Sequence, residues 1–249
     1  AGMVSGGKVL RRNLKFKPDC LVVFNEETKR YAQSINPQQR VEVIPNGVNL
    51  SLFSPSGEKF DHGLSGSVVL TVGSLNRRNH KRLHLAVDAV SKVPDGALLI
   101  CGDGPDKQYF EELCSRKLGP SRFKIVTVDF SDIPKVYRSV DLFSLPSEDE
   151  PFGRVYLEAM ASGLAIIGTN VGAVERQIQG NGLLLEKPDV TALEEAITSV
   201  ANLEDEFITA LKQKSLDLIA DQFVWAKVIE QKISDFEMCL AKANSNQLS

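Results

Sequence analysis

The sequence has 249 residues, 43% of them hydrophobic and 24% charged, which is the composition of a globular protein with a sizeable buried core. A formal net charge of −3 excludes recognition of nucleic acid or of an acidic membrane by overall charge. No apolar run reaches the roughly 18 residues of a membrane-spanning helix, so no such helix is predicted.

The first part of the chain, residues 1–45, is predicted to form a strand at 20–24, a helix, and a short strand at 41–44. The breaker Pro45-Asn46-Gly47 then ends this part. A turn and a polar stretch follow, so we expect a domain boundary and a linker at residues 46–66.

Residues 67–220 alternate short apolar runs with longer amphipathic segments. The runs predicted to be strands lie at 67–73, 97–102, 123–128, 141–146, 164–169 and 182–186. They are rich in β-branched residues and apolar on both faces, as parallel strands covered on both sides are. Helical patterns at 82–93 and 106–118 lie between strands. The sequence therefore predicts an α/β fold with a doubly wound parallel sheet.

Two consecutive helices, at about 203–219 and 223–243, follow without an intervening strand, and we expect them to cap or leave the sheet. The four cysteines (Cys20, Cys101, Cys114 and Cys239) include no CxxC pair. We expect reduced thiols in a reducing compartment, with neither disulfides nor a zinc site. The opening residues lack the apolar core of a signal peptide and are expected to be a start within a longer protein.

Three loops at strand ends are predicted to bind a ligand, because open parallel sheets bind ligands at the carboxyl ends of their strands. They are residues 73–83, 102–107 and 146–163. In the third, Pro151 and Gly153 precede a helix whose first amides, at about Gly153–Tyr156, are expected to lack partners. Such a helix end attracts an anion by roughly 0.3–1 kcal/mol when exposed, and a diphosphate would suit it.

Glu150 and Glu158 flank that helix end. If both were helical they would lie about 12 Å apart along the axis, whereas a retaining glycosidase needs its carboxyl groups about 5–5.5 Å apart. The spacing argues against a glycosidase pair and suits two contacts on a long ligand, one at each end of a diphosphate. The alternative is that Glu150 only caps the helix and Glu158 pairs with Arg154.

The first loop holds Arg77, Arg78, Lys81 and Arg82 within six residues. Positive charge is unfavourable at a helix N-terminus, which favours an anionic ligand over a merely solvated helix start. The segment GDGP at 102–105 is not GxGxxG, because Lys107 stands where a third glycine would be. That departure counts against a dinucleotide-dependent oxidoreductase. No histidine has a partner at metal-ligand spacing, so no metal site is predicted.

Several segments, in one order, resemble the C-terminal half of retaining glycosyltransferases of family 4, which have two Rossmann-like domains in the GT-B arrangement. They are GSLNRRNHKRLHLAVDAV, LLICGDGP, DLFSLPSEDEPFGRVYLEAMASGLAIIGT, GNGLLLEKPD and FVWAKVIEQ. The resemblance covers about residues 17–243. It implies that residues 1–45 are a remnant of the N-terminal, acceptor-side domain and 67–220 the donor-binding domain. Residues 221–249 would be the helix that crosses back, and its tail.

The resemblance also implies roles for individual residues. Glu150, with the backbone near Phe152 and Gly153, would hold the donor sugar, Glu158 the ribose, and Lys81 the phosphates. The residues expected to bind the donor are Arg77, Arg78, Lys81, Gly102, Gly104, Val128, Glu150, Phe152, Gly153, Arg154, Val155, Tyr156 and Glu158, and Glu150 and Lys81 are expected to be catalytic.

The sequence departs from the family pattern in two places. Ser74 stands where the family usually has an arginine, and we expect Arg77 or Arg78, on a slightly longer loop, to replace it. The usual GGxPE reads VGAVE at 171–175, with Glu175 kept. The acceptor-side catalytic residues would belong to the N-terminal domain, which is expected to be largely absent.

The activity implied is transfer of a hexose-type sugar, with retention, from a nucleotide-diphosphate sugar such as a UDP- or GDP-sugar to an acceptor hydroxyl, with no metal or other cofactor. The acceptor would be a glycan, a lipid-linked sugar or a small molecule. The expected location is the cytoplasm or the cytosolic face of a membrane, with any peripheral membrane contact made by the N-terminal domain. The alternative is a non-catalytic module that binds a nucleotide or nucleotide-sugar.

Overall fold

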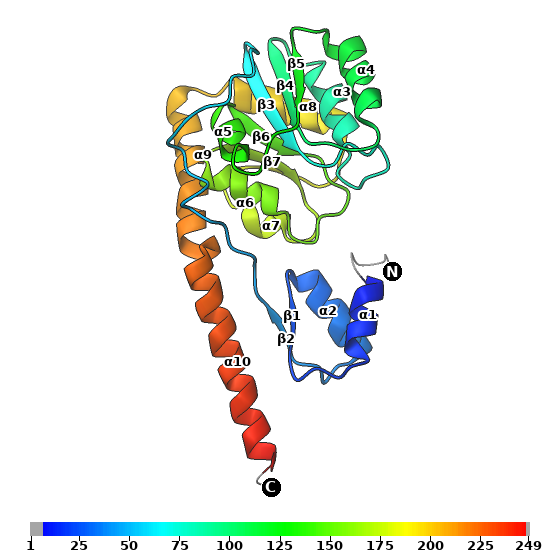
Figure 1. The fold of residues 1–249 in the computed structure, drawn as a ribbon, viewed down its shortest axis with the longest axis vertical. Helices are drawn as coiled ribbons and strands as arrows, with labels where there is room; N and C mark the ends of the chain where they lie inside the picture. Colours follow the sequence, from blue (N-terminus) through cyan, green and yellow to red (C-terminus); the bar gives the residue numbers. More distant parts are fainter. Residues whose placement is uncertain (1–6, 248–249) are drawn as a thin grey trace.

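The protein contains two parallel sheets of unequal size, joined by an extended segment and a long C-terminal helix (Figure 1). The computed structural model describes residues 7–247 of the chain. The larger sheet carries most of the buried apolar residues, and the smaller one has a separate small core.

The larger sheet has six strands in the order β5-β4-β3-β6-β7-β8, all parallel. The strands are β3 (Ser67–Val72), β4 (Gly96–Cys101), β5 (Phe123–Val126), β6 (Leu142–Leu145), β7 (Ala165–Thr169) and β8 (Gly182–Leu185). Every residue of β4, β6 and β7 is buried, as expected for strands covered on both faces. The doubly wound sheet predicted from the sequence is confirmed.

Helices cover both faces of this sheet (Figure 1). They are α3 (Leu83–Val90), α4 (Lys107–Leu118), α5 (Ile133–Arg138), α6 (Arg154–Ala161), α7 (Val174–Gln177) and α8 (Val190–Ala201). Helix α3 packs against α4 and α8, whereas α6 packs against α5, α7 and α9 (Asp205–Leu218). The chain order reverses at β3 and β6, which pair with each other in the middle of the sheet. The loops after these two strands therefore meet at the topological switch point, where such folds bind ligands.

The smaller sheet pairs β1 (Leu21–Val23) with β2 (Val41–Val43) and is covered by α2 (Glu26–Ile35). Helix α1 (Gly7–Leu14) was not among the predicted elements. Its Leu10 and Leu14, four residues apart, reach the small core while the lysine and arginine side chains face water.

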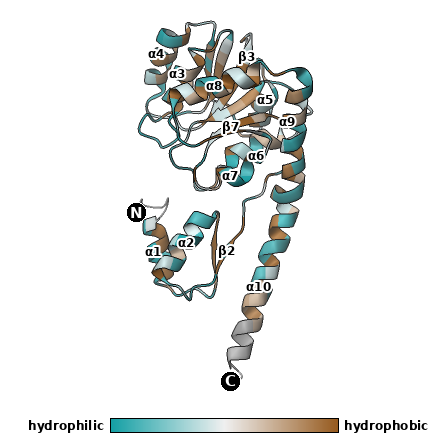
Figure 2. Cartoon of the chain, turned by 180° about the vertical axis from the view of Figure 1, so that it is seen from behind, coloured by the Kyte–Doolittle hydropathy of each residue, from teal (hydrophilic) through white to brown (hydrophobic). Residues whose placement is uncertain are grey.

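The chain leaves the large sheet through α9, a π-helical turn at Ile219–Phe223, and α10 (Trp225–Gln247). Helix α10 then runs beside the N-terminal unit (Figure 1), where Arg40 contacts Asp235 at 3.4 Å and Cys239 at 3.3 Å. Figure 2 shows apolar residues interspersed along this helix, but none of the helices described in residues 7–247 is long and apolar enough to span a bilayer.

The linker and the start of α10 cross at a close contact. The amide of Val48 donates to the carbonyl of Phe223 at 2.8 Å, and a Cβ on Gly47 would lie 2.7 Å from the Trp225 ring. Glycine at position 47 therefore permits the approach of the two segments.

Candidate functional site

The loops after β3 and β6 lie against each other at the switch point of the large sheet. The amide of Glu148 donates to the carbonyl of His80 at 2.8 Å, and Arg82 Nε donates to the Glu148 carboxylate at 2.8 Å. Arg82 adopts a left-handed conformation (φ 52°) as it enters α3. The loop after β4 joins them, because Leu75 N donates to Asp103 O at 2.9 Å.

The pair of Lys81 and Glu150 is the charged centre of this arrangement. Lys81 Nζ lies 3.6 Å from Glu150 Oε2, and the two side chains are 18% and 10% exposed. The aliphatic stem of Lys81 passes over Gly73, where a Cβ would lie 2.7 Å from Lys81 Cδ. Glu150 Oε2 is buried and accepts no hydrogen bond from the described residues. The carboxylate therefore keeps acceptor capacity for a ligand.

The backbone that carries Glu150 is fixed on several sides. The Phe152 carbonyl accepts from Gln177 Nε2 at 2.6 Å, and the Glu150 carbonyl lies against Gly172, where a Cβ would come within 1.9 Å of it. Gly153 turns the chain into α6 with a φ of 83°. These contacts give the loop one defined path at the start of the helix.

The first turn of α6 presents open amides. No hydrogen bond within residues 7–247 uses the backbone N–H groups of Gly153, Arg154 or Val155. Tyr156 departs from the prediction, since its amide donates to the Gly153 carbonyl at 3.0 Å. The first turn is tighter than an α-helical turn, because the left-handed Gly153 accepts through its carbonyl from the amide three residues later. Three amides, rather than four, remain to attract an anion.

Two aromatic side chains of this segment belong to the core. Tyr156 is fully buried and its hydroxyl donates to the Leu145 carbonyl at 2.7 Å. Phe152 lies between Phe24 and Phe223, with ring centroids 5.5 and 6.5 Å away. Any donor contact of these two residues would therefore use their backbone.

Glu158 faces a small cavity of about 110 Å³ that Phe130, Asn49 and Trp225 also line. Tyr137 Oη donates to Glu158 Oε2 at 3.0 Å. Burial raises the pKa of Glu158, while the Tyr137 hydrogen bond and the charges of Arg154 and Lys81 oppose that rise. Arg154 is close enough to act on the carboxylate but forms no ion pair with it among the described residues. The alternative interpretation of Glu158 as a simple i, i+4 partner is therefore not what the structure contains.

Three further residues that were predicted to bind the donor lie just after β4 and β5. Gly102 lies against Gly73 and Gly104 against Leu75, where added Cβ atoms would come within 1.9 and 2.6 Å of backbone oxygens. These glycines allow the loops after β3 and β4 to touch. Val128 lies just beyond β5, half-buried.

The two arginines of the first loop differ from each other. Arg77 turns toward α4, where its Nε lies 3.6 Å from Asp106 Oδ1 and its guanidinium 5.4 Å from the Tyr109 ring centroid. Arg78 is exposed and forms no ion pair in the described part of the chain. Arg77 is thus already engaged, whereas Arg78 remains available.

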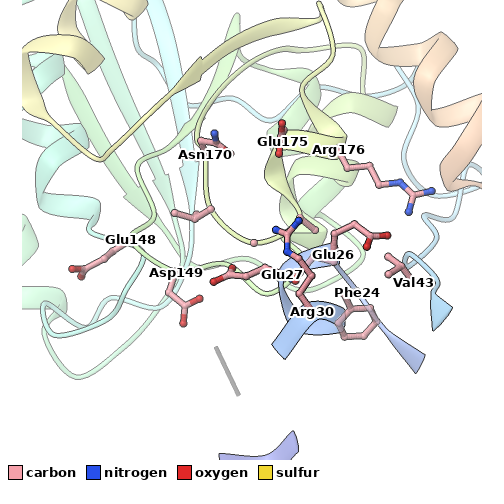
Figure 3. Close-up of a pocket in the computed structure, with 14 residues that line it drawn as sticks. Phe24, Glu26, Glu27, Arg30, Val43, Glu148, Asp149, Asn170, Glu175 and Arg176 are labelled. Atoms are coloured by element: carbon pink, nitrogen blue, oxygen red, sulfur yellow. The ribbon is translucent and has the colours of Figure 1, made fainter. Parts of the chain in front are cut away.

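A larger cavity of about 750 Å³ separates the N-terminal unit from the large domain (Figure 3). One wall is the start of α2, with Glu26, Glu27 and Arg30, and the other is the loop at 170–173 with Glu175 of α7. Glu148 and Asp149, next to the candidate donor site, also line it. The cavity therefore opens next to the residues that precede Glu150.

Sequence reasoning missed two residues of the site. Tyr137, in α5, orients Glu158, and Asn25, before α2, reaches the Pro151 carbonyl with its Nδ2 at 2.9 Å. The only sequence signal for Asn25 is its place before an acidic first turn, which is typical of a helix cap. Nothing near Tyr137 in the sequence indicates its partner, because the contact spans 21 residues.

Comparison with known proteins gives one family. The sequence model described as glycosyl transferases group 1 matches residues 66–202. A lipopolysaccharide core biosynthesis mannosyltransferase of Rhizobium meliloti is 31% identical, with 72% of this chain and 54% of the relative covered. The chain spans about half the length of the curated relatives it matches.

Solved structures agree with that result. A sucrose-phosphate synthase from Thermosynechococcus elongatus matches with a TM-score of 0.77 and 26% identity, over 90% of this chain and 59% of that one. HepE of Anabaena, solved with UDP and glucose, matches with a TM-score of 0.77 and 20% identity, over 92% of this chain and 66% of that one. The second likeness shows the fold.

Proposed function

Because this chain belongs to the glycosyl transferases of group 1, we propose that it is the donor-binding half of a retaining glycosyltransferase. The donor is a hexose linked to a nucleoside diphosphate, and the acceptor carries a hydroxyl group. The proposal includes a location where nucleotide sugars are made, in the cytoplasm or at the cytosolic face of a membrane.

One observation carries the proposal. Lys81 and Glu150, from loops that follow two different strands, approach to 3.6 Å beside the open amides of α6. A cation and unpartnered amides suit a diphosphate, and a carboxylate with spare acceptor capacity suits sugar hydroxyls. Glu158, held by Tyr137 further along the same helix, can accept from the ribose hydroxyls.

The mechanism uses these groups to stabilise the leaving diphosphate. As the bond between sugar and phosphate breaks, negative charge gathers on the phosphate and the sugar gains oxocarbenium character. The ammonium of Lys81 and the amides of Gly153, Arg154 and Val155 are fixed before the reaction, so they stabilise this charge without reorganising. At 3.6 Å from Glu150, the Lys81 ammonium is not locked in a short hydrogen bond and can move onto the phosphate. We assign charge compensation to these groups and to no metal.

Within residues 7–247, the N-terminal unit contributes to the cavity beside Glu150 only the start of α2, the two residues before it and Val43 of β2. We therefore expect this chain alone to bind the donor weakly and not to transfer sugar. The other candidate function is a binding module for a nucleotide or nucleotide sugar, which shares the same site and differs only in having no activity when the acceptor half is supplied.

Calorimetry of the 249-residue chain with UDP, GDP, ADP, UDP-glucose and GDP-mannose tests the proposal. We expect one base to be preferred and its binding to survive EDTA. Equal or absent binding of all five compounds would refute a nucleotide-sugar site. Robust transfer by the chain alone would refute the expectation that it lacks the acceptor half.

A further inference from the structure

The N-terminal unit contacts the loop that carries Glu150 through the side chain of Asn25. Asn25 Nδ2 donates to the carbonyl of Pro151, the residue after Glu150, at 2.9 Å. Phe24, the residue before, packs its ring on Phe152 with centroids 5.5 Å apart. We propose that Asn25 is a positioning residue that couples the N-terminal unit to Glu150 and so to the sugar of the donor. This inference rests on the proposed function.

The chemistry of asparagine fits this position because both ends of its amide are used. Asn25 Oδ1 accepts from Thr28 N at 2.7 Å and caps α2, while Nδ2 faces the Pro151 carbonyl. Asn25 is only 7% exposed. A flipped amide would lose both hydrogen bonds in a buried place, so the side chain has one favourable orientation.

Apart from Asn25 and the Phe24–Phe152 ring contact, the contacts described on this loop come from its own domain. Gln177 holds the Phe152 carbonyl and Gly172 lies under the Glu150 carbonyl. Asn25, in contrast, belongs to the unit built on β1 and β2, 126 residues earlier in the chain. Displacement of the N-terminal unit therefore pulls on the peptide next to Glu150 but not directly on Lys81, Glu158 or the α6 amides.

In this geometry the two parts of the donor contact different residues. Nucleotide and phosphates would contact Lys81, Glu158 and the helix amides, whereas the sugar would contact Glu150. Loss of the Asn25–Pro151 hydrogen bond should therefore weaken binding of a nucleotide sugar more than binding of the nucleotide alone. The quantity that isolates the effect is the ratio of Kd for the nucleotide to Kd for the nucleotide sugar.

The variants are chosen to keep the helix cap. Asn25→Ser and Asn25→Asp both preserve an oxygen for Thr28 N, but serine is one atom too short to reach Pro151 and aspartate has no N–H to donate. Asn25→Ser adds no charge. If both variants change the Kd ratio alike, the new carboxylate of Asn25→Asp is therefore not the cause of the change. Asn36→Ser and Asn36→Asp make the same changes at the other end of α2, where the Asn36 side chain, among the described residues, forms one hydrogen bond, from Gln38 N to its Oδ1.

The experiment measures Kd for UDP and UDP-glucose, and for GDP and GDP-mannose, by calorimetry on the full 249-residue chain. For the pair that wild type binds, we expect both Asn25 variants to lower the ratio three- to tenfold, as the loss of one hydrogen bond implies, with nucleotide Kd within twofold of wild type. The Asn36 variants should leave the ratio unchanged.

Two outcomes would overturn the inference. They are an unchanged ratio, which includes an equal loss for nucleotide and nucleotide sugar, and the same fall of the ratio in the Asn36 variants. Absence of nucleotide binding in wild type would instead refute the proposed function, so the two failures are distinguishable. Amide hydrogen exchange gives a second readout, since loosening of the loop should speed exchange of the Glu148 N–H, which donates to the His80 carbonyl, and leave α2 protected.

Discussion

Lys81 and Glu150 form a close, largely buried ion pair between loops that follow two adjacent strands, with Nζ 3.6 Å from Oε2. In the proposed mechanism the lysine leaves this partner for the phosphates. Lys81→Ala should lower the affinity for the nucleotide sugar that wild type binds, taken below to be UDP-glucose, at least tenfold, because a charge-assisted contact is lost. It should also cost about 1–2 kcal/mol of stability, since Glu150 loses its counter-charge. Calorimetry and urea unfolding measure the two effects.

Lys92→Ala is the matched control for Lys81, since Lys92 is an exposed lysine after α3 that forms no ion pair in the described residues. It should change neither the Kd nor the unfolding midpoint. If Lys81→Ala kept wild-type affinity while losing stability, the lysine would have a structural role only.

Glu158 gives the site a pH dependence. Its pKa is raised by burial, and only the ionised carboxylate can accept from both ribose hydroxyls. UDP-glucose affinity should therefore increase as pH rises from about 4.5 toward 7 and then level off. UDP-glucose is the better ligand here, because its phosphates lack the second ionisation near pH 6 of a phosphate monoester. Glu158→Gln should bind weakly at every pH and remove this slope.

The same group affects stability with the opposite sign. A carboxyl whose pKa is higher in the folded state binds more protons than in the unfolded state, so the free energy of unfolding falls as pH rises through that interval. In urea unfolding measured at a series of pH values, Glu158→Gln should remove this fall in the free energy of unfolding. Tyr137→Phe deletes the hydrogen bond that favours ionisation and should move both transitions to higher pH. Transitions that stay in place would show that Tyr137 does not tune Glu158.

Much of this architecture was predictable because it depends on local patterns. All six strands of the large sheet were predicted from short runs of β-branched residues, and Glu150 and Lys81 from their places in strand-end loops. Contacts between distant segments were not predictable. Nothing in the sequence pairs Tyr137 with Glu158 or Asn25 with Pro151, because each depends on how the helices pack after the sheet forms. Helix α1 was missed because only two buried leucines mark its apolar face.

The close approach of Gly172 to Glu150 predicts a further effect on the site. Gly172 has a φ of +58°, and a Cβ there would lie 1.9 Å from the Glu150 carbonyl. Gly172→Ala should therefore displace the Glu150 backbone and lower UDP-glucose affinity at least tenfold. Its loss of stability should exceed the roughly 1–2 kcal/mol of left-handed strain alone.

Gly180→Ala separates the strain from the displacement. Gly180 also has a positive φ, +82°, but a Cβ there would meet nothing within 4 Å. This variant should lose stability from strain alone and bind UDP-glucose like wild type. Equal binding by both variants would show that Glu150 tolerates movement of its backbone, contrary to its proposed role.

Ser74 marks the position where the sequence departs from the family's usual arginine, and we propose that Arg78 rather than Arg77 compensates. Arg77 is held by Asp106 and Tyr109, whereas Arg78 is free of ion pairs among the described residues. Arg78→Ala should therefore weaken UDP-glucose binding by about three- to tenfold, the loss of a partly screened charge, and Arg77→Ala by less than twofold. Ser74→Arg, at an exposed position directly after Gly73, should restore the affinity of Arg78→Ala. Calorimetry of Arg77→Ala, of Arg78→Ala and of the double variant Ser74→Arg/Arg78→Ala measures these changes in affinity. A larger loss for Arg77→Ala than for Arg78→Ala would mean that the Arg77–Asp106 ion pair opens when the diphosphate binds. If Ser74→Arg did not restore the affinity of Arg78→Ala, an arginine at position 74 would not reach the place where this loop brings its cation to the diphosphate.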